Sequence, residues 1–302
     1  MPPQRDRKWS SATGVAESRA ARGLPSTGTA PGDQRGAAFS QRLGETERKD
    51  AWWLIPALQA LGLIVLIGYA NWAAFLGAAH YHYVERGRDY LSPFFSPYLH
   101  PSWLPAWLSP ALLILGIPLG FRATCYYYRK AYYRSFFGDP FACAVGEARS
   151  KGYCGEVKFP FIVQNAHRYF LYAAIVILAI LWVDVVHAFR FDGHFGVGGG
   201  SLAILFSTGT LSLYTFSCHS LRHLVGGKLD CFSCVRGGGA RHRAWSWLTV
   251  LNEHHMGWAW ISLFAVCFAD LYVRLCSMGV IHDPMLATFG NLFDVPEKVF
   301  GP

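Results

Sequence analysis

The chain has 302 residues, of which 52% are hydrophobic, 16% aromatic and 15% charged, and its net charge is +8. A soluble domain has about a quarter charged residues, so this composition excludes an ordinary soluble domain and indicates a helical membrane protein. The basic excess does not indicate a nucleic-acid partner, because Lys and Arg on inner loops orient membrane proteins. The 8 cysteines lack the spacing of a small disulfide framework, which favours free thiols or metal ligands.

Residues 1–50 differ in composition from the rest of the chain. They are rich in Arg, Gly, Ser, Pro and Ala and contain few large apolar side chains. Such a segment cannot bury enough apolar surface to offset the entropy lost on ordering, so we expect a disordered N-terminal tail. It lacks the apolar core of a secretory signal, and we therefore expect the N-terminus to stay in the cytoplasm.

Five apolar segments follow, each long enough to supply the roughly 20 residues that a helix needs to cross a bilayer. They cover residues 52–79, 103–128, 161–189, 201–224 and 244–273. The expected fold is all-α, an integral membrane bundle of five transmembrane helices within residues 51–302. Pro110 and Pro118 are expected to bend the second helix.

Charge gives these spans a direction. Lys and Arg are frequent after the second and fourth spans and sparse on the other side. The positive-inside rule then predicts a cytoplasmic N-terminus and an extracytoplasmic C-terminus. The second and fourth spans consequently end, and the third and fifth begin, on the cytoplasmic side.

Cysteine and histidine side chains gather at these inner helix ends. Metal-binding side chains are rare in membrane spans and usually mark a redox centre, an ion path or a ligand site. His219 and His223 are four residues apart, so they share one face of a helix. The candidates at this level are Cys125, His167, Cys218, His219, His223, His254 and His255.

Two kinds of redox centre suit these residues. Two Cys and two His form the ligand set of a Rieske-type [2Fe–2S] cluster, and two His on facing helices form that of a b-type haem. Thiols at the level of the histidines favour the cluster. Cys267 and Cys276 are expected to be small apolar fillers. Cys231 and Cys234 form a CxxC pair, which suits either a metal or a labile disulfide.

Several stretches are distinctive enough to indicate a family. They are residues 120–137 (GFRATCYYYRKAYYRSFF), 139–145 (DPFACAV), 164–170 (QNAHRYF), 217–223 (SCHSLRH) and 252–256 (NEHHM). Together they resemble the single-subunit, five-helix membrane anchor of a class of bacterial succinate dehydrogenase, respiratory complex II. The resemblance covers about residues 52–273.

This resemblance implies a function and partners. The chain would be the quinone-reducing membrane subunit of a succinate:quinone oxidoreductase, not a complete enzyme alone, in the bacterial cytoplasmic (inner) membrane. Its partners would be a flavoprotein subunit and an iron–sulfur subunit, which we expect to dock on the inner loops 129–160 and 226–243. The enzyme would serve the respiratory chain and the tricarboxylic acid cycle.

The resemblance also implies cofactors. Electrons would pass through an embedded Rieske-type [2Fe–2S] cluster to a quinone, expected to be menaquinone, and haem b is the alternative cofactor. Four ligands are expected from the matching positions, which are Cys125, Cys143, His167, Cys218, His219, His223 and His255.

The quinone is expected near the inner interface. Tyr127 and Trp258 are candidates for apolar walls of its pocket, and Arg168 or Arg222 for a hydrogen bond to a quinone carbonyl. The alternative from another function class is a non-redox transporter or assembly protein. A transporter is expected to have broken helices at the membrane midplane, whereas these apolar runs read as mostly continuous.

Overall fold

The computed structural model describes residues 42–75, 79–105, 108–147, 156–227 and 229–289. Residues 1–41 of the expected tail lie outside this part of the chain. Residues 42–50 are described, and they hydrogen-bond with the segment 143–146. The Gly44 amide donates to the Gly146 carbonyl over 2.9 Å, and Arg48 Nη1 donates to the Cys143 carbonyl over 2.9 Å.

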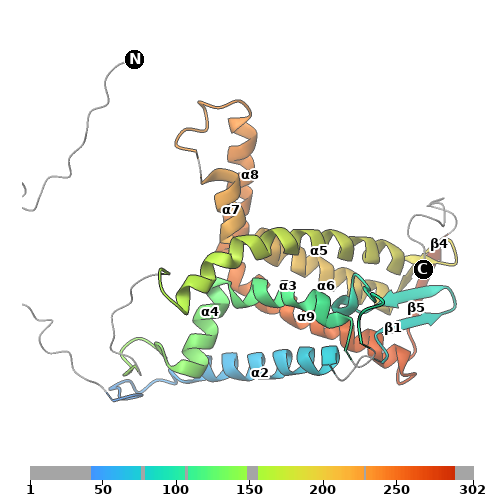
Figure 1. The fold of residues 1–302 in the computed structure, drawn as a ribbon, viewed down its shortest axis with the longest axis horizontal. Coiled ribbons are helices and arrows are strands. Elements are labelled where there is room, and N and C mark those ends of the chain that lie inside the picture. Colours follow the sequence, from blue (N-terminus) through green and yellow to red (C-terminus); the bar gives the residue numbers. More distant parts are fainter. Residues whose placement is uncertain (1–41, 76–78, 106–107, 148–155, 228, 290–302) are drawn as a thin grey trace, which may run out of the picture. The chain divides into compact units, whose positions relative to one another are not determined.

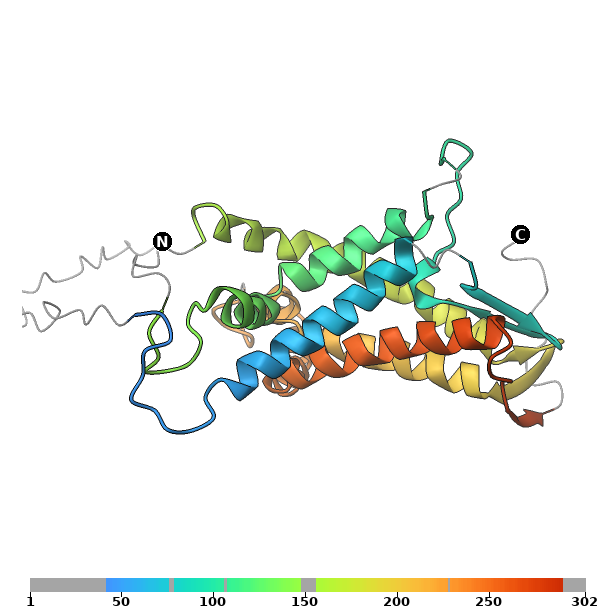
Figure 2. The same cartoon turned by 90° about the horizontal axis from the view of Figure 1, so that it is seen from below.

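Long apolar helices form the body of the protein. Because hydrocarbon offers no hydrogen-bond partners, a helix is the simplest way for an apolar segment to satisfy its own backbone in a membrane. Figures 1 and 2 show the long helices running side by side. They are α2 (Leu54–Phe75), α3 (Ala111–Ala123), α5 (His167–Ala188), α6 (Gly199–Phe216) and α9 (His255–Ser277).

Shorter helices continue or precede several of the long ones. α3 is followed by α4 (Tyr126–Tyr132) and a π-helical turn, η3 (Tyr133–Phe137), and α5 is preceded by the 3₁₀ helix η4 (Phe161–Ala166). α6 is followed by α7 (His219–Gly226), which pairs with α8 (Gly238–Glu253) in a helical hairpin beyond the end of the long helices (Figure 1). A 3₁₀ helix, η2 (Pro93–Phe95), precedes α3.

Two small antiparallel sheets lie at the opposite end of the long helices from α4 and α7 (Figure 1). β1 (His82–Glu85) pairs with β2 (Arg88–Leu91), with Tyr83 opposite Tyr90. β3 (Arg190–Phe191), β4 (His194–Gly198) and β5 (Met285–Phe289) form the second sheet in the order β3-β4-β5. The protein is therefore mostly helical, and the all-α prediction missed both sheets because their strands are only 2 to 5 residues long.

The number of membrane spans is three to five among the described residues. Leu54–Phe75, Phe161–Ala188 and His255–Ser277 are long and apolar enough on their own. Two further pairs qualify if each bent pair counts as one span. Ala111–Ala123 and Tyr126–Phe137 meet at 80°, and Gly199–Phe216 and His219–Gly226 meet at 55°.

Several predicted boundaries were wrong. The second helix begins at Ala111 rather than at residue 103, and its sharp bend lies after Ala123, beyond Pro118. Residues 244–253 belong to α8, so the fifth long helix begins only at His255. The second and fourth apolar runs were expected to be continuous but are broken. The breaks fall where a hydroxyl side chain bonds back to a helix carbonyl, a contact that bends helices.

The core divides into two clusters of buried side chains. One surrounds Cys125, Tyr214 and Cys218 between α3, α6 and α9. The other includes Tyr90 and Val273 and lies next to the sheets. Two buried ion pairs lie at the sheet end: Arg88 Nη1–Asp283 Oδ2 at 2.8 Å and, within α9, Arg274 Nε–Asp270 Oδ2 at 2.7 Å.

Candidate metal centre

Cys125 and Cys218 occupy equivalent places in their helices. Each is the residue just before a short helix, Cys125 before α4 and Cys218 before α7. Their backbones match closely, with φ −63° and ψ 129° at Cys125 and φ −63° and ψ 132° at Cys218. The first N–H groups of a helix have no partner within the helix and carry its positive dipole end.

A hydroxyl residue precedes each cysteine and explains the break. Thr124 Oγ1 donates to the Gly120 carbonyl over 2.7 Å, and Ser217 Oγ donates to the Tyr214 carbonyl over 2.9 Å. Each bond uses a carbonyl of the last helical turn, a contact that favours a bend at this point. The bend exposes the next residue, the cysteine, to the interior of the bundle.

The two hydroxyls also fix two histidines. Thr124 Oγ1 lies 3.0 Å from His167 Nδ1, and Ser217 Oγ lies 2.7 Å from His255 Nδ1. Because the single proton of each hydroxyl is already donated to a carbonyl, the hydroxyl oxygen accepts the proton on Nδ1. The Nε2 of each histidine is therefore unprotonated, so it can accept a hydrogen bond or bind a metal. A hydrogen bond of this kind on the far nitrogen is typical of metal-binding histidines.

The free nitrogens face the cysteines crosswise. His167 Nε2 lies 3.2 Å from Cys218 Sγ, and His255 Nε2 lies 3.4 Å from Cys125 Sγ. Cys125 and Cys218 are only 3% and 1% exposed. The two pairs also act on each other electrostatically, Cys125 on Cys218 and His167 on His255. In the described part of the chain the donors stand as two pairs, and no three His, Cys, Asp or Glu side chains form a ready-made metal shell.

Aromatic rings enclose both histidines. The Phe121 ring stacks on His167 with centroids 4.7 Å apart, and the Tyr214 ring stacks on His255 at 5.1 Å. The Tyr214 hydroxyl is buried and has no hydrogen-bond partner among the residues described. The hydroxyl lies next to the Cys125 thiol.

Arg122 was not predicted as part of this site. Its Nη1 donates to the Tyr128 hydroxyl over 2.6 Å, and its Nη2 donates to Ser262 Oγ over 3.0 Å. The guanidinium also lies 4.7 Å from the centre of the Tyr214 ring. The only sequence signal was its position three residues before Cys125, together with the Ser or Thr before each cysteine.

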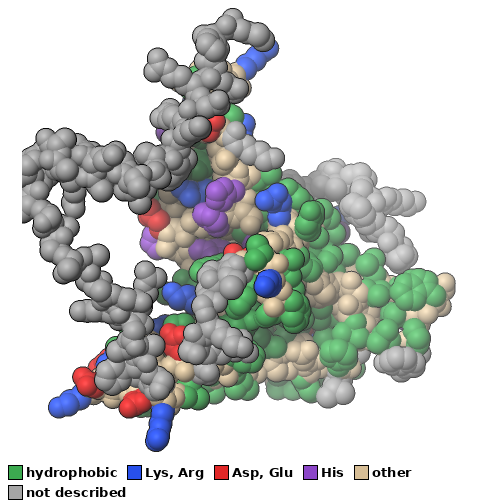
Figure 3. Space-filling model, turned by 60° about the vertical axis from the view of Figure 1, so that its left-hand side comes forward, with side chains coloured by type: hydrophobic (Ala, Val, Ile, Leu, Met, Phe, Trp, Pro, Cys, Tyr) green, Lys and Arg blue, Asp and Glu red, His purple; other side chains and the backbone are tan. Residues whose placement is uncertain are grey.

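Three other predicted metal ligands lie elsewhere. His219 and His223 form a separate, exposed pair with their Nε2 atoms 2.9 Å apart. Figure 3 shows histidine side chains gathered on one face of the protein, next to basic and acidic side chains. Cys143 is exposed and lies against Arg48 of the segment before α2. Exposed His254 contacts the Val250 carbonyl at 3.3 Å and does not face the four donors.

The structure separates the four predicted quinone residues into two groups. Tyr127 and Trp258 pack against the core that contains Cys125 and Cys218. The Tyr127 hydroxyl accepts from Trp260 Nε1 over 2.6 Å, whereas Trp258 Nε1 is buried without a partner among the described residues. Arg168 is exposed, and Arg222 is held on the hairpin by Thr249 Oγ1 at 2.9 Å and by the Trp245 ring.

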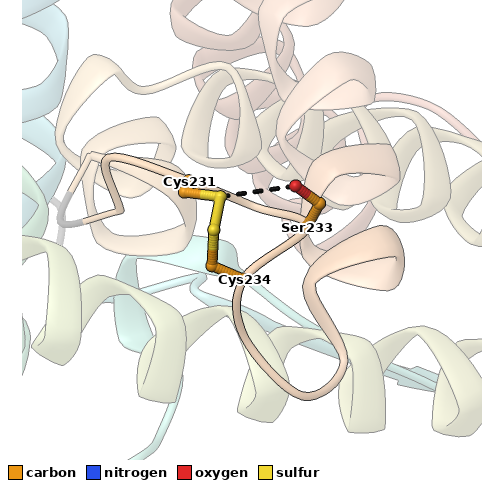
Figure 4. Close-up of a disulfide and its surroundings, with 3 residues drawn as sticks. All are labelled: Cys231, Ser233 and Cys234. Carbon is orange, nitrogen blue, oxygen red and sulfur yellow. Dashed lines mark hydrogen bonds between the residues drawn. A yellow bond between two sulfur atoms is a disulfide. The ribbon is translucent and has the colours of Figure 1, made fainter.

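The CxxC pair lies in the connection between α7 and α8. Cys231 and Cys234 are joined by a disulfide, and Ser233 Oγ lies 3.3 Å from Cys231 Sγ (Figure 4). The sequence left a metal site and a disulfide as alternatives for this pair, and the structure has the disulfide. Two further cysteines, Cys267 and Cys276, are free and buried in α9, as expected of fillers.

Comparison with known proteins identifies the family. Residues 54–279 match the family described as actinobacterial succinate dehydrogenase subunit SdhC. A solved structure, the Mycobacterium smegmatis Sdh1 complex in the apo form, contains a chain with 39% sequence identity and a TM-score of 0.71. That match covers 79% of this chain and 92% of the other. No curated protein matches. The chain belongs to the SdhC family of succinate dehydrogenase membrane subunits.

Proposed function

We propose that this chain takes electrons from the iron–sulfur subunit of its succinate dehydrogenase and passes them, through a [2Fe–2S] cluster of Rieske type, to a quinone. The ligands proposed are Cys125, His167, Cys218 and His255. The observation that carries the proposal is the crosswise pairing of two buried thiols with the unprotonated Nε2 atoms of two imidazoles. His167 and His255 begin α5 and α9, and Cys125 and Cys218 immediately precede α4 and α7.

The residues fit such a cluster in their chemistry. Two thiolates and two neutral imidazoles are the ligand set of a Rieske-type centre. The partnerless Tyr214 hydroxyl beside Cys125 supports the presence of a further acceptor in the bound state, such as a cluster sulfur. Structural reasons also favour the four over the other candidates, because His219, His223 and Cys143 are exposed.

A b-type haem suits the geometry less well. Bis-imidazole ligation needs two Nε2 atoms that face one another across the macrocycle. Here each Nε2 faces a sulfur, and each imidazole is covered by an aromatic ring, Phe121 on His167 and Tyr214 on His255. Thiols have no role in bis-histidine haem ligation, whereas they are half of the ligand set of the cluster.

The cluster would supply one-electron transfer, and the chain supplies its setting. Thr124 and Ser217 hold the two imidazoles in one tautomer and orientation. Buried aromatic rings keep water from the thiols. Trp258, with a free indole N–H next to the same core, is the proposed donor of a hydrogen bond to the quinone, and Tyr127 forms an apolar wall. Arg168 and Arg222 remain secondary candidates, since both lie away from that core.

The proposed partners and quinone follow from the same arrangement. A flavoprotein subunit would oxidise succinate, and an iron–sulfur subunit would dock on residues 129–160 and 226–243 at the end of the bundle where the four donors lie. This end would face the cytoplasm in a five-span topology. The quinone proposed is menaquinone. Crosslinking that maps the iron–sulfur subunit to the sheet end would overturn this placement.

The test is spectroscopic. The intact complex is purified with its partner subunits, and iron, acid-labile sulfide, optical absorption and electron paramagnetic resonance are measured. Two iron and two sulfide beyond the partner's content, with a Rieske-type resonance, are expected. A Soret band with no extra sulfide would instead establish haem b. The absence of both signals would identify the chain as a non-redox anchor.

Single substitutions then identify the ligands. Cys125→Ser, Cys218→Ser, His167→Ala and His255→Ala are each expected to abolish the extra resonance. Cys267→Ser is the matched control, because it changes a buried free thiol on the helix that carries His255. His219→Ala with His223→Ala is expected to keep the resonance. Its loss in that double variant, with survival in Cys218→Ser, would refute the proposed ligand set.

A further inference from the structure

Arg122 differs from the buried arginines of this protein in its partners. The three buried arginines all pair with carboxylates, at 2.8, 3.1 and 2.7 Å: Arg88 with Asp283, Arg129 with Glu156 and Arg274 with Asp270. Arg122 pairs with no Asp or Glu among the residues described. Its cation is therefore not balanced by the protein's acidic side chains.

The groups around the Arg122 guanidinium are neutral and buried. They are the Tyr128 hydroxyl, Ser262 Oγ and the Ala259 carbonyl, the last at 3.2 Å from Nη1. Tyr128 is 4% exposed, and Ser262 and Ala259 are 0% exposed. These contacts tie the side chain of an α3 residue to α9. A cation fixed among buried neutral groups in a membrane is costly unless a negative charge compensates it.

The four proposed ligands are the nearest source of that charge. Arg122 lies three residues before Cys125, and it acts electrostatically on His255. The Tyr214 ring, which the guanidinium covers, stacks on the His255 ring. The charged and titratable groups that face Arg122 are thus His255 and Cys267 from α9, Tyr128 and Tyr214, with no Asp or Glu among the described ones.

We propose that Arg122 is a positioning residue whose charge stabilises the reduced state of the centre held by Cys125, His167, Cys218 and His255. This inference rests on the proposed function. Two thiolates bring two negative charges to the site, and one electron from the iron–sulfur subunit adds another. No bond forms or breaks and no proton moves. The fixed guanidinium favours the reduced form over the oxidised one and so raises the midpoint potential.

The test is a redox titration of the centre's paramagnetic resonance in the intact complex. Arg122→Gln is expected to shift the reduction equilibrium at least tenfold toward the oxidised form, which is 59 mV for a one-electron couple. Arg122→Lys keeps the charge and is expected to stay closer to the unmodified complex. Arg86→Gln is the control, because it removes the same charge from the turn between β1 and β2 at the sheet end, where Arg86 is exposed.

A second variant tests the same role if Arg122→Gln fails to assemble into the complex. Ser262→Asp places a carboxylate against Nη2 and neutralises the cation without removing it, so a lowered potential is again expected. Unchanged potentials in both variants, or an equal shift in Arg86→Gln, would overturn the role of Arg122. Absence of any such centre from the unmodified complex is a different result, and it would defeat the proposed function itself.

Discussion

Ser217 Oγ lies 2.7 Å from His255 Nδ1, and Ser217 is the residue immediately before Cys218. Thr124, the residue before Cys125, makes the same contact with His167 at 3.0 Å. Each hydroxyl lies at the end of the helix that precedes one cysteine. It also contacts the histidine that faces the other cysteine. The two halves of the site are therefore linked through two hydroxyls.

The first prediction concerns these hydroxyls. Ser217→Ala removes the acceptor of the His255 Nδ1 proton, so the imidazole can turn or change tautomer. Loss of such a partner typically costs about 10–100-fold in metal affinity or activity. We expect less iron in the purified complex and faster loss of it to a chelator. Ser217→Thr keeps the hydroxyl and should retain iron, and equal iron in Ser217→Ala would contradict this role.

Two tyrosines should respond oppositely to loss of their hydroxyls. A buried hydroxyl without a partner costs about 1–3 kcal/mol, so in protein from iron-depleted cells Tyr214→Phe should leave the melting temperature unchanged or raise it. The Tyr128 hydroxyl accepts from Arg122 and donates to the Ala259 carbonyl, each over 2.6 Å. Tyr128→Phe loses both bonds and should therefore lower the melting temperature. Thermal unfolding in detergent measures both. Clear destabilisation by Tyr214→Phe would show that its hydroxyl has a partner in the protein.

Gly120 should not tolerate a side chain. A Cβ there would collide with the Phe170 ring, by which α5 packs against α3 close to the donors. Overpacking of this kind costs about 1–3 kcal/mol, so Gly120→Ala is expected to lower the melting temperature and the iron content. Gly116→Ala lies one turn earlier on α3 with open space around it and serves as the control. Equal melting temperatures for the two variants would contradict this account.

At the sheet end, the buried ion pair of Arg88 with Asp283 should contribute more to stability than the exposed pair of His82 with Asp89. Asp283 is buried and accepts from Arg88, Tyr90, Tyr272 and the Gly200 amide. Removing one partner of a buried pair costs about 3–5 kcal/mol, so Asp283→Ala should abolish stable expression. Asp89, in contrast, forms an exposed pair with His82, and such pairs contribute at most about 1 kcal/mol. Detergent extracts compared by size exclusion should show normal protein for Asp89→Ala.

That exposed pair gives the sheet end a pH dependence. The hydrogen bond from His82 Nε2 to Asp89, 2.6 Å long, raises the pKa of His82 above its usual value. A raised pKa in the folded state means that the pair stabilises the protein below the unfolded pKa and that this gain is lost as pH rises through the folded pKa. The difference in melting temperature between the unmodified protein and His82→Ala should therefore shrink with rising pH. A difference that grows would contradict the assignment.

The sequence predicted that Cys and His side chains gather at one end of the bundle, but not which of them face one another. Apolar length located the long helices because lipid-facing segments leave a continuous signal. Apolar length could not locate the helix breaks at Cys125 and Cys218, because each break lies within an apolar run. A single hydroxyl residue marks each break, Thr124 in one case and Ser217 in the other. Without the breaks, adjacent Cys218 and His219 were equal candidates, although Cys218 faces inward and His219 outward.

The strands were missed for a different reason. Pairs such as β1 with β2 are held by a turn and by buried tyrosines from distant segments, Tyr83 and Tyr90 against Val273. No periodicity of hydrophobic residues is visible in 4-residue strands. Arg122 was missed because an arginine at the inner end of a span reads as an ordinary interfacial charge. Only the three-dimensional contacts show that it is tied to buried groups on α9.

The helix discontinuities at the four donors set how the site sits in the electric field of the membrane. His255 begins a helix of 23 residues, about 34 Å of apolar rise, and Cys218 follows one of 18 residues. If these helices span the bilayer as proposed, the four donors would lie at one edge of the hydrocarbon layer, not at its centre. An electron and a proton that both reach this level from the same side traverse little of the transmembrane voltage, which acts at about 2.3 kcal/mol per charge per 100 mV. Quinone reduction at this edge would consequently neither draw on the membrane potential nor add to it.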